Sequence, residues 1–430
     1  MRENTKVSTI ADIKASKIIQ CISLIFLLYY VFFWDMKFVN SRYILIGLFV
    51  TAVLNIIVDR SVFFFTPLKG FLCVLLCNLL GIIGSGGSGG SYGVRLFSQM
   101  AICFIVFVCF AHCELSYRGI LRIFIILCAI YTGGIFLQVI NPGIVQTVNR
   151  AVLDRAAFDS YQTLSKYKYY MGFSGFNCMS ALFAGVLSGI YLSKVILFNN
   201  SFIKRLIYAS IGFIGFIAMI VAQKRGIFVA CAVSIIIMIL ISVANKKNVR
   251  KLSLAILLIL LLFVGIYLYL QNSESGIVFI KRFTASDDIS SGRFDIFSLL
   301  LTEAKNSFLL GKGTGASQNT LTNSGAHNIY IQVYFDHGII GILIYIIWFI
   351  SNFSFTIKLY RNTSNTIIEK QILFVSMYVQ ILFLVYGLFG NPINDIYIFL
   401  LYVFFTALPC ILKQRIIKIP LKNEGADEKA

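Results

Sequence analysis

The chain has 430 residues, of which 58% are apolar and only 13% are charged, with a formal net charge of +19. A soluble domain is closer to half apolar and a quarter charged, so this composition excludes an ordinary soluble globular protein. The positive charge does not indicate a nucleic-acid partner, because the basic residues lie in small groups between long apolar runs, as in the cytoplasmic loops of membrane proteins.

Apolar runs long enough to cross a bilayer recur along the whole chain. A spanning helix needs about 20 mostly apolar residues, because the hydrocarbon core is about 30 Å thick. We interpret the first run as a retained span rather than a cleaved signal peptide, because Asp35, Met36 and Lys37 follow it in place of a small-residue cleavage site. The runs begin near Ile18, Tyr43, Leu68, Leu96, Gly119, Gly175, Leu206, Gly226, Leu252, Ile339, Ile372 and Tyr397.

These runs predict an all-α, polytopic membrane bundle of about twelve transmembrane helices over residues 1–412. A basic tail follows at 413–430, and most of the 37 Lys and Arg fall on one side of the membrane when the N-terminus is placed in the cytoplasm. This bias predicts that both termini are cytoplasmic. Two long connections, at about 141–172 and 271–338, then lie on the outer side, and connections of this length are usually functional or disordered.

The cysteines and carboxylates give no indication of a metal or a cofactor. All ten cysteines fall inside or at the edge of apolar runs, and no Cys-x-x-Cys pair occurs. A disulfide framework or a zinc site would space them differently, so we interpret them as small apolar residues. The long connections contain no cluster of carboxylates with metal-ligand spacing. We therefore expect a metal-independent activity without a cofactor.

The larger connection has the pattern of an amphipathic helix over Phe294–Leu310. Its apolar positions recur at helical spacing, which predicts a helix on the membrane surface or over the bundle. The predicted apolar face consists of Phe294, Phe297, Leu301, Ala304 and Phe308. Gly311, the first residue of the sequence GKGTG, is expected to end the helix as a left-handed C-cap. GKGTG lacks the Walker pattern, so we expect no nucleotide site there.

The order of motifs from this helix onward resembles a known family. SGRFDIF, NSFLLGKGTG and AHNIYIQVYFDHGIIG follow one another along the chain. Together they resemble the shared signature of bacterial O-antigen polymerases (Wzy) and O-antigen ligases (WaaL). Two earlier stretches, GFSGFNCMSALFAG and AQKRGIFVA, fit the same family. The resemblance covers roughly residues 170–345, and the first five spans match only in hydropathy.

The resemblance implies a GT-C-like membrane bundle that transfers sugars from undecaprenyl-pyrophosphate-linked oligosaccharides. The reaction would take place on the outer, periplasmic face of the bacterial inner membrane, with membrane lipid around the site. Such a reaction needs cations for the departing pyrophosphate, and arginine is suited because it stays charged and binds phosphate with two hydrogen bonds. It also needs a base for the acceptor hydroxyl.

Arg293 is the strongest candidate for the pyrophosphate, because it stands where the family has an arginine at the start of the outer helix. The alternative is an interfacial arginine that reaches the lipid headgroups. Arg225 and Lys224 stand in a short outer turn, against the usual charge bias, and are candidates for substrate binding or ordinary turn charges.

His327 occupies the family's His-Asn position and is the second catalytic candidate. Both roles remain open for it: a base, or a second contact to the pyrophosphate. Asn328 is expected to orient or cap the helix that follows. Arg150, Arg155 and Arg282 are candidates for binding the lipid-linked sugar, or else solvated loop charges.

Three functions fit this sequence. We favour a polymerase of O-antigen or a related surface polysaccharide, because two long basic connections suit an enzyme that holds both a growing chain and an incoming unit. The second is an O-antigen ligase, which transfers the polymer to the lipid A core. The third is a lipid-linked oligosaccharide flippase, which usually has similar halves and charges at mid-membrane depth. The sequence does not show whether a polysaccharide chain-length regulator is a partner, or whether the product is a capsule.

Overall fold

The structure is a computed structural model. It describes residues 10–59, 65–84, 89–112, 116–198, 200–243, 260, 264, 267–284, 292–321, 325–362 and 366–427. Within these ranges every element is a helix, apart from an isolated bridge between Met36 and Leu153. This confirms the all-α polytopic fold that the apolar runs predict.

Eleven helices of the described residues are long and apolar enough to cross a membrane. They agree with eleven of the predicted runs, and the run predicted from Leu252 lies largely outside the described residues. The eleven are α1 (Ile10–Phe33), α2 (Ser41–Asp59), α3 (Thr66–Gly84), α4 (Gly90–Ala111), α5 (Tyr117–Ile140), α8 (Asn177–Leu197), α9 (Phe202–Val221), α10 (Arg225–Val243), α15 (Ile329–Arg361), α16 (Ile367–Tyr386) and α17 (Ile396–Asp427).

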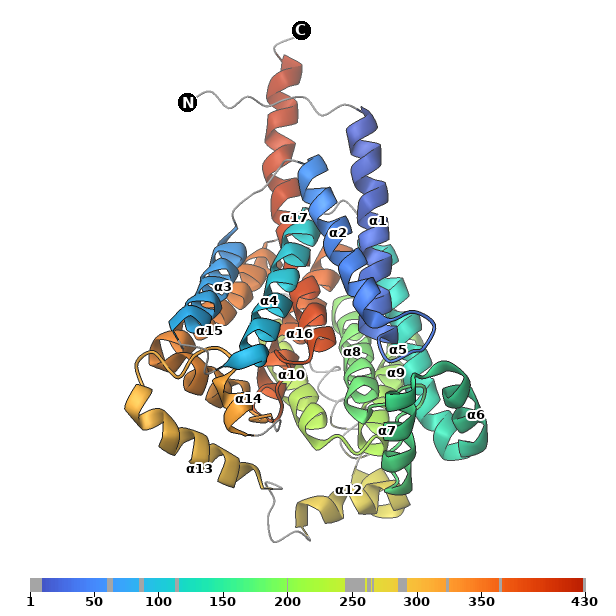
Figure 1. The fold of residues 1–430 in the computed structure, drawn as a ribbon. Coiled ribbons are helices and arrows are strands. Elements are labelled where there is room, and N and C mark those ends of the chain that lie inside the picture. Colours follow the sequence, from blue (N-terminus) through green and yellow to red (C-terminus); the bar gives the residue numbers. More distant parts are fainter. Residues whose placement is uncertain are drawn as a thin grey trace.

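The spanning helices differ strongly in how far they are buried. In α17 94% of the spanning window is buried inside the protein, and in α8 78%, whereas in α2 only 22% is buried. Helices α8, α16 and α17 therefore form the centre of the bundle, and α2 lies at its edge (Figure 1). Apart from Arg42 near its start, the exposed side chains of α2 are apolar, as expected where lipid takes the place of a protein partner.

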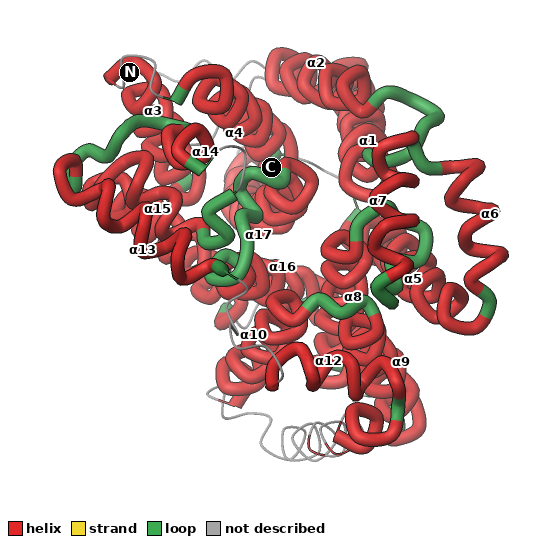
Figure 2. Tube along the Cα trace, turned by 60° about the horizontal axis from the view of Figure 1, so that its bottom comes forward, coloured by secondary structure: helices red, strands yellow, loops and turns green. Residues whose placement is uncertain are grey.

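Both long connections fold into short helices at one end of the bundle, which we call the loop end. The described part of α1 begins, and α17 ends, at the opposite end (Figure 1). The first connection forms α6 (Pro142–Val152) and α7 (Arg155–Lys166), and the second forms α12 (Glu274–Thr284), α13 (Arg293–Ala304) and α14 (Ala316–Thr320). Figure 2 turns the loop end forward and shows α13 and α14 beside α15, with α12 beside α9, in agreement with their contacts.

The helix predicted over Phe294–Leu310 is shorter than expected, and Ala304 is the one described residue of its predicted apolar face that is buried. Helix α13 ends at Ala304, and a 3-10 turn follows at Lys305–Ser307, so Gly311 is not its C-cap. Phe294 and Leu301 are exposed, and the protein-facing side is formed by Leu300, Ala304 and the partly buried Ile296. Two adjacent faces of this helix are apolar, and contact with α14 and α15 decides which one is buried.

Candidate functional site

The connection between α16 and α17, residues 387–395, is the hub of the loop end. Its backbone carbonyl groups accept hydrogen bonds from two segments that are far apart in the sequence, the start of α13 and the start of α15. Arg293 Nη1 donates to the Phe389 carbonyl at 3.1 Å, Asn328 Nδ2 donates to that of Leu388 at 3.4 Å, and the Ile329 amide donates to that of Gly387 at 2.9 Å. The hub therefore fixes the start of α13 relative to the start of α15.

The turn between α9 and α10 approaches the same hub through a glycine. A Cβ atom at Gly226 would come within 2.8 Å of Phe389 Cβ, a distance that folded proteins do not tolerate. Glycine at this position lets the start of α10, with Lys224 and Arg225 before it, lie against the hub. Both cationic residues are half-buried there.

Arg293 is positioned by a left-handed glycine. Gly292 has φ of 78°, a conformation that glycine adopts at little cost, and α13 begins at the next residue. The guanidinium uses one nitrogen for the Phe389 carbonyl. A guanidinium carries five N–H donors, and among the described residues one carbonyl group is a partner of this side chain.

His327 has a strained backbone and a perturbed imidazole. Its φ is +51°, uncommon for a residue with a side chain, and it directly precedes α15. Desolvation, followed by the positive charges of Arg293 and Lys224, lowers the pKa of His327 below its usual 6.5. The imidazole is therefore neutral at pH 7, although it remains accessible at the surface.

These observations bring three of the expected residues into one electrostatic neighbourhood, which we call the cationic site: Lys224, Arg293 and His327. Arg225 adjoins it at the first residue of α10. Asn328 supports it, because its side-chain oxygen accepts the amides of Tyr330 and Ile331 and so caps α15.

The other three expected residues lie on different segments. Arg150 is exposed at the end of α6, with its guanidinium 5.9 Å from the centre of the Phe158 ring, and Arg155 is exposed at the start of α7. In Figure 2, α6 lies at the opposite edge of the bundle from α13. Arg282 belongs to α12, but its side chain lies outside the described residues.

Asp395, at the end of the hub, belongs to the cationic site but has no counterpart among the residues expected from the sequence. Burial raises the pKa of its carboxyl to about 6, an effect that the positive charges of Lys224 and Arg95 oppose. Asp395 lies in a short connection between two apolar runs, and nothing in the length of that connection points to a functional residue. The signal was nevertheless present, since Gly-Asn-Pro-Ile-Asn-Asp places an acid directly before a span.

The GKGTG turn packs against the first part of α15 and holds it as a clasp through backbone and side-chain hydrogen bonds. The amides of Lys312 and Gly313 donate to the carbonyl groups of Phe335 and Asp336. In return, the Asp336 carboxylate accepts the amides of Gly315 and Ser317 at 3.1 and 2.8 Å. Lys312 pairs with Glu303 at 2.7 Å. The turn thus joins α13 to the segment that carries His327.

Gly338 makes this clasp possible. It interrupts α15 with φ of 63° and ψ of −163°, and a Cβ atom there would come within 2.4 Å of the Leu309 backbone. The amide of Ile339, freed by the kink, donates to the Phe308 carbonyl at 2.8 Å. The glycines of the motif therefore allow close backbone contact.

The fold and the site define a multi-pass membrane protein with a cationic site at one end of its helical bundle. Residues 210–346 match the family model described as O-antigen ligase. The match contains Lys224, Arg293 and His327, and it confirms the resemblance to the Wzy and WaaL superfamily. It supports a role in processing O-antigen-related polysaccharide through glycosyl transfer, on lipid-linked sugar and membrane lipid. No curated protein matches the chain.

Proposed function

We propose that this protein is a polymerase of O-antigen or a related surface polysaccharide, which joins undecaprenyl-pyrophosphate-linked repeat units. The observation that carries the proposal is the cationic site, where Lys224, Arg293 and His327 meet at the loop end of a membrane bundle. In the proposed mechanism the cationic site lies on the periplasmic face of the inner membrane, and both termini lie in the cytoplasm. A lipid tail would remain in the bilayer while its pyrophosphate reaches the loop end.

The reaction needs a hydroxyl of the acceptor sugar to attack the anomeric carbon of the donor sugar. A new C–O bond forms, and the bond from the anomeric carbon to the pyrophosphate oxygen breaks with both electrons going to that oxygen. Arg293 and Lys224 stabilise the charge that develops on the leaving pyrophosphate. Because this charge is held by fixed side chains, no metal ion is needed in the proposed mechanism.

The proton of the attacking hydroxyl must pass to a base, and two groups of the site are suitable. His327 is neutral at pH 7 because its pKa is lowered. Asp395, with a pKa of about 6, is mostly ionised at the same pH. Both are therefore in the proton-accepting form, and their different chemistry makes them distinguishable by pH and by substitution.

The second candidate function is an O-antigen ligase, which the description of the matching family favours. Ligase and polymerase share the donor and the leaving group, and differ in the acceptor. We favour the polymerase because the loop end carries two structured connections, which suits an enzyme that holds a growing chain and an incoming unit. A flippase is disfavoured because the charged groups described above gather at one end of the bundle rather than at its middle.

Deletion of the gene in a strain with a complete surface polysaccharide separates these functions. The polymerase predicts lipopolysaccharide with a single repeat unit on its core, seen as one band above the core on a gel. Bare core with accumulated lipid-linked polymer would instead establish the ligase. Loss of lipid-linked units from the periplasmic face would overturn both enzymes in favour of the flippase. Complementation by the intact gene is the control.

A further inference from the structure

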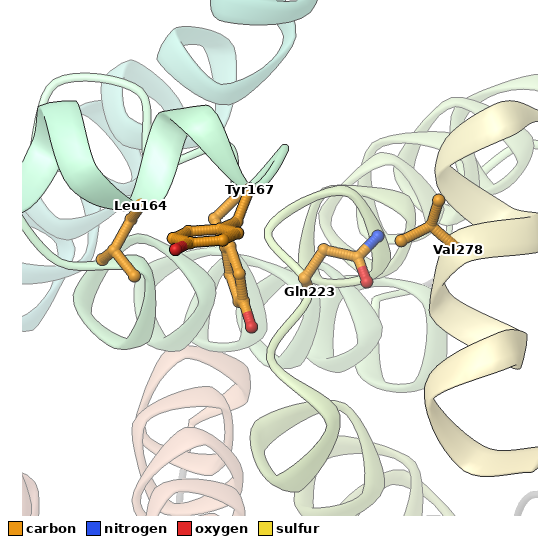
Figure 3. Close-up of a pocket in the computed structure, with 5 residues that line it drawn as sticks. Leu164, Tyr167, Gln223 and Val278 are labelled. Carbon is orange, nitrogen blue, oxygen red and sulfur yellow. The ribbon is translucent and has the colours of Figure 1, made fainter. Parts of the chain in front are cut away.

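A cavity of about 440 Å³ lies at the loop end, outside the cationic site. It opens to the surface and is lined by the end of α7, the turn between α9 and α10, and α12. Figure 3 shows Leu164 and Tyr167 on one side, facing Gln223 and Val278 on the other. Tyr169 completes the lining. The volume falls within the range of about 300–1,000 Å³ that is usual for small-molecule sites.

The tyrosine side of the cavity has an unusual backbone. Helix α7 ends in a Schellman motif, in which the Tyr169 amide donates to the Leu164 carbonyl and the Lys168 amide to that of Ser165. Lys168 takes the left-handed position of this motif, with φ of 58°, where glycine is usual. This conformation turns the chain between Tyr167 and Tyr169, so that both tyrosines line one cavity.

The segment after α7 is held firmly against α5. The side-chain oxygen of Gln138 accepts the amides of Met171 and Gly172 at 2.7 and 2.8 Å, and its nitrogen donates to Ser165 at 3.3 Å. Gln138 is itself buried. The two tyrosines therefore project from a fixed wall rather than from a free loop, although Tyr167 is 70% exposed.

The backbone on the opposite side of the cavity, at Gln223, is strained as well. Gln223 is buried with φ of 58°, and Lys224 of the cationic site follows it directly in the chain. In the described ranges only Lys168, Gln223 and His327 combine a side chain with a left-handed φ. His327 belongs to the cationic site, Gln223 lines this cavity, and Lys168 lies in the chain between the two lining tyrosines. Backbone strain of this kind is concentrated at functional sites.

We infer that this cavity is a carbohydrate subsite, which holds sugar residues of the repeat unit next to the cationic site. The faces of Tyr167 and Tyr169 suit the C–H faces of pyranose rings, because an aromatic face carries partial negative charge. The phenol group of the exposed Tyr167 can exchange hydrogen bonds with sugar hydroxyls. Among the described residues that line the cavity none is charged, so a neutral oligosaccharide fits better than a phosphate.

This inference rests on the proposed glycosyl transfer, but binding can be tested without any transfer. The probe is the repeat-unit oligosaccharide of the producing strain, released from its lipid-linked unit by mild acid, which cleaves the bond between the sugar and the pyrophosphate. Its binding to the purified full-length protein is measured by saturation-transfer NMR, with no lipid-linked donor present. The subsite predicts binding to the wild type that weakens about tenfold in Tyr167→Ala and in Tyr169→Ala, whereas Tyr167→Phe keeps most of it.

The control is Tyr43→Ala, because Tyr43 is as exposed as Tyr167, at 70%, and lies at the start of α2. It should bind like the wild type. Equal binding by the wild type and both tyrosine-to-alanine variants would overturn the subsite, even if the protein proves to be a polymerase. Conversely, a wild type that binds the sugar but never transfers it would contradict the proposed function and leave the subsite standing.

Steady-state transfer then identifies which chain occupies the cavity. A higher KM for the acceptor in Tyr167→Ala, with the donor KM unchanged, assigns the cavity to the acceptor. A higher KM for the donor alone assigns it to the donor glycan. If kcat falls and neither KM changes, the tyrosines do not bind substrate sugar, and the inference fails.

Discussion

The two long connections of this protein use their positive charges in opposite ways. In residues 141–172, Arg150 and Arg155 are exposed, and the buried contacts are made by apolar and amide groups packed on α5. In residues 271–338, Arg293 is half-buried, bonded to the hub, and close enough to His327 to lower its pKa. Charge that the fold gathers and partly desolvates can act on a substrate, whereas charge left in solvent is largely screened.

The largest effect is expected at Arg293. Arg293→Ala should reduce polymer formation by about 10²–10³-fold, because it removes the donor aimed at the leaving pyrophosphate. Arg293→Lys should recover little, since an ammonium group cannot reproduce the two-pronged contact. Polymer length on gels and transfer by the purified protein measure both. Lys305→Ala, an exposed cation in the same connection, is the control and should behave as the wild type.

His327→Gln should lower transfer by about 10²-fold if the imidazole is the base. Because its pKa is lowered, the wild-type rate should hold at neutral pH and fall only as the pH drops through that lowered pKa. The variant should lack this acid-side decline. If the variant shows the same loss of rate at low pH as the wild type, the base is Asp395 rather than His327.

Asp395→Asn tests how the buried carboxyl group of Asp395 contributes to the stability of the fold. Its folded pKa, about 6, is above its unfolded value, so the stabilisation is complete below the unfolded pKa and is lost as the pH rises through about 6. Removing the carboxylate should therefore raise the Tm by a few °C at pH 8 and hardly at pH 4. Thermal unfolding in detergent checks this, and a lower Tm at pH 8 would show that Lys224 and Arg95 stabilise the charged form more than burial opposes it.

The smallest effect is expected in the first connection. Arg150→Ala and Arg155→Ala should each change transfer by less than about twofold, because exposed charges contribute little. Transfer by both variants is measured together with transfer by Arg293→Ala. A loss of activity in either variant as large as that in Arg293→Ala would contradict the proposed difference between the two connections.

The sequence predicts the bundle well because a membrane imposes length and hydropathy on each span. Eleven predicted runs are helices, and Arg293 lies near enough to His327 to lower its pKa, whereas their shared catalytic role stays a prediction. Asp395 escaped attention because its importance comes from the hub, which gathers segments distant in the chain. Local spacing cannot reveal such contacts.

The buried face of α13 shows the same limit. Phe294 and Leu301 follow helical spacing with Ala304, yet the residues that pack on the protein beside Ala304 are Ile296 and Leu300. Both faces are apolar, so periodicity alone does not choose between them. The GKGTG turn is similar, since its role as a clasp depends on Asp336 and Gly338, which come more than twenty residues later.

The central claim is that the cationic site holds the pyrophosphate of the lipid-linked donor. Binding of undecaprenyl pyrophosphate to the purified protein tests it most directly, with the wild type compared with Arg293→Ala and the control Lys305→Ala. We predict that the Kd rises at least about tenfold in Arg293→Ala and is unchanged in the control. Equal affinity in all three proteins would contradict the account.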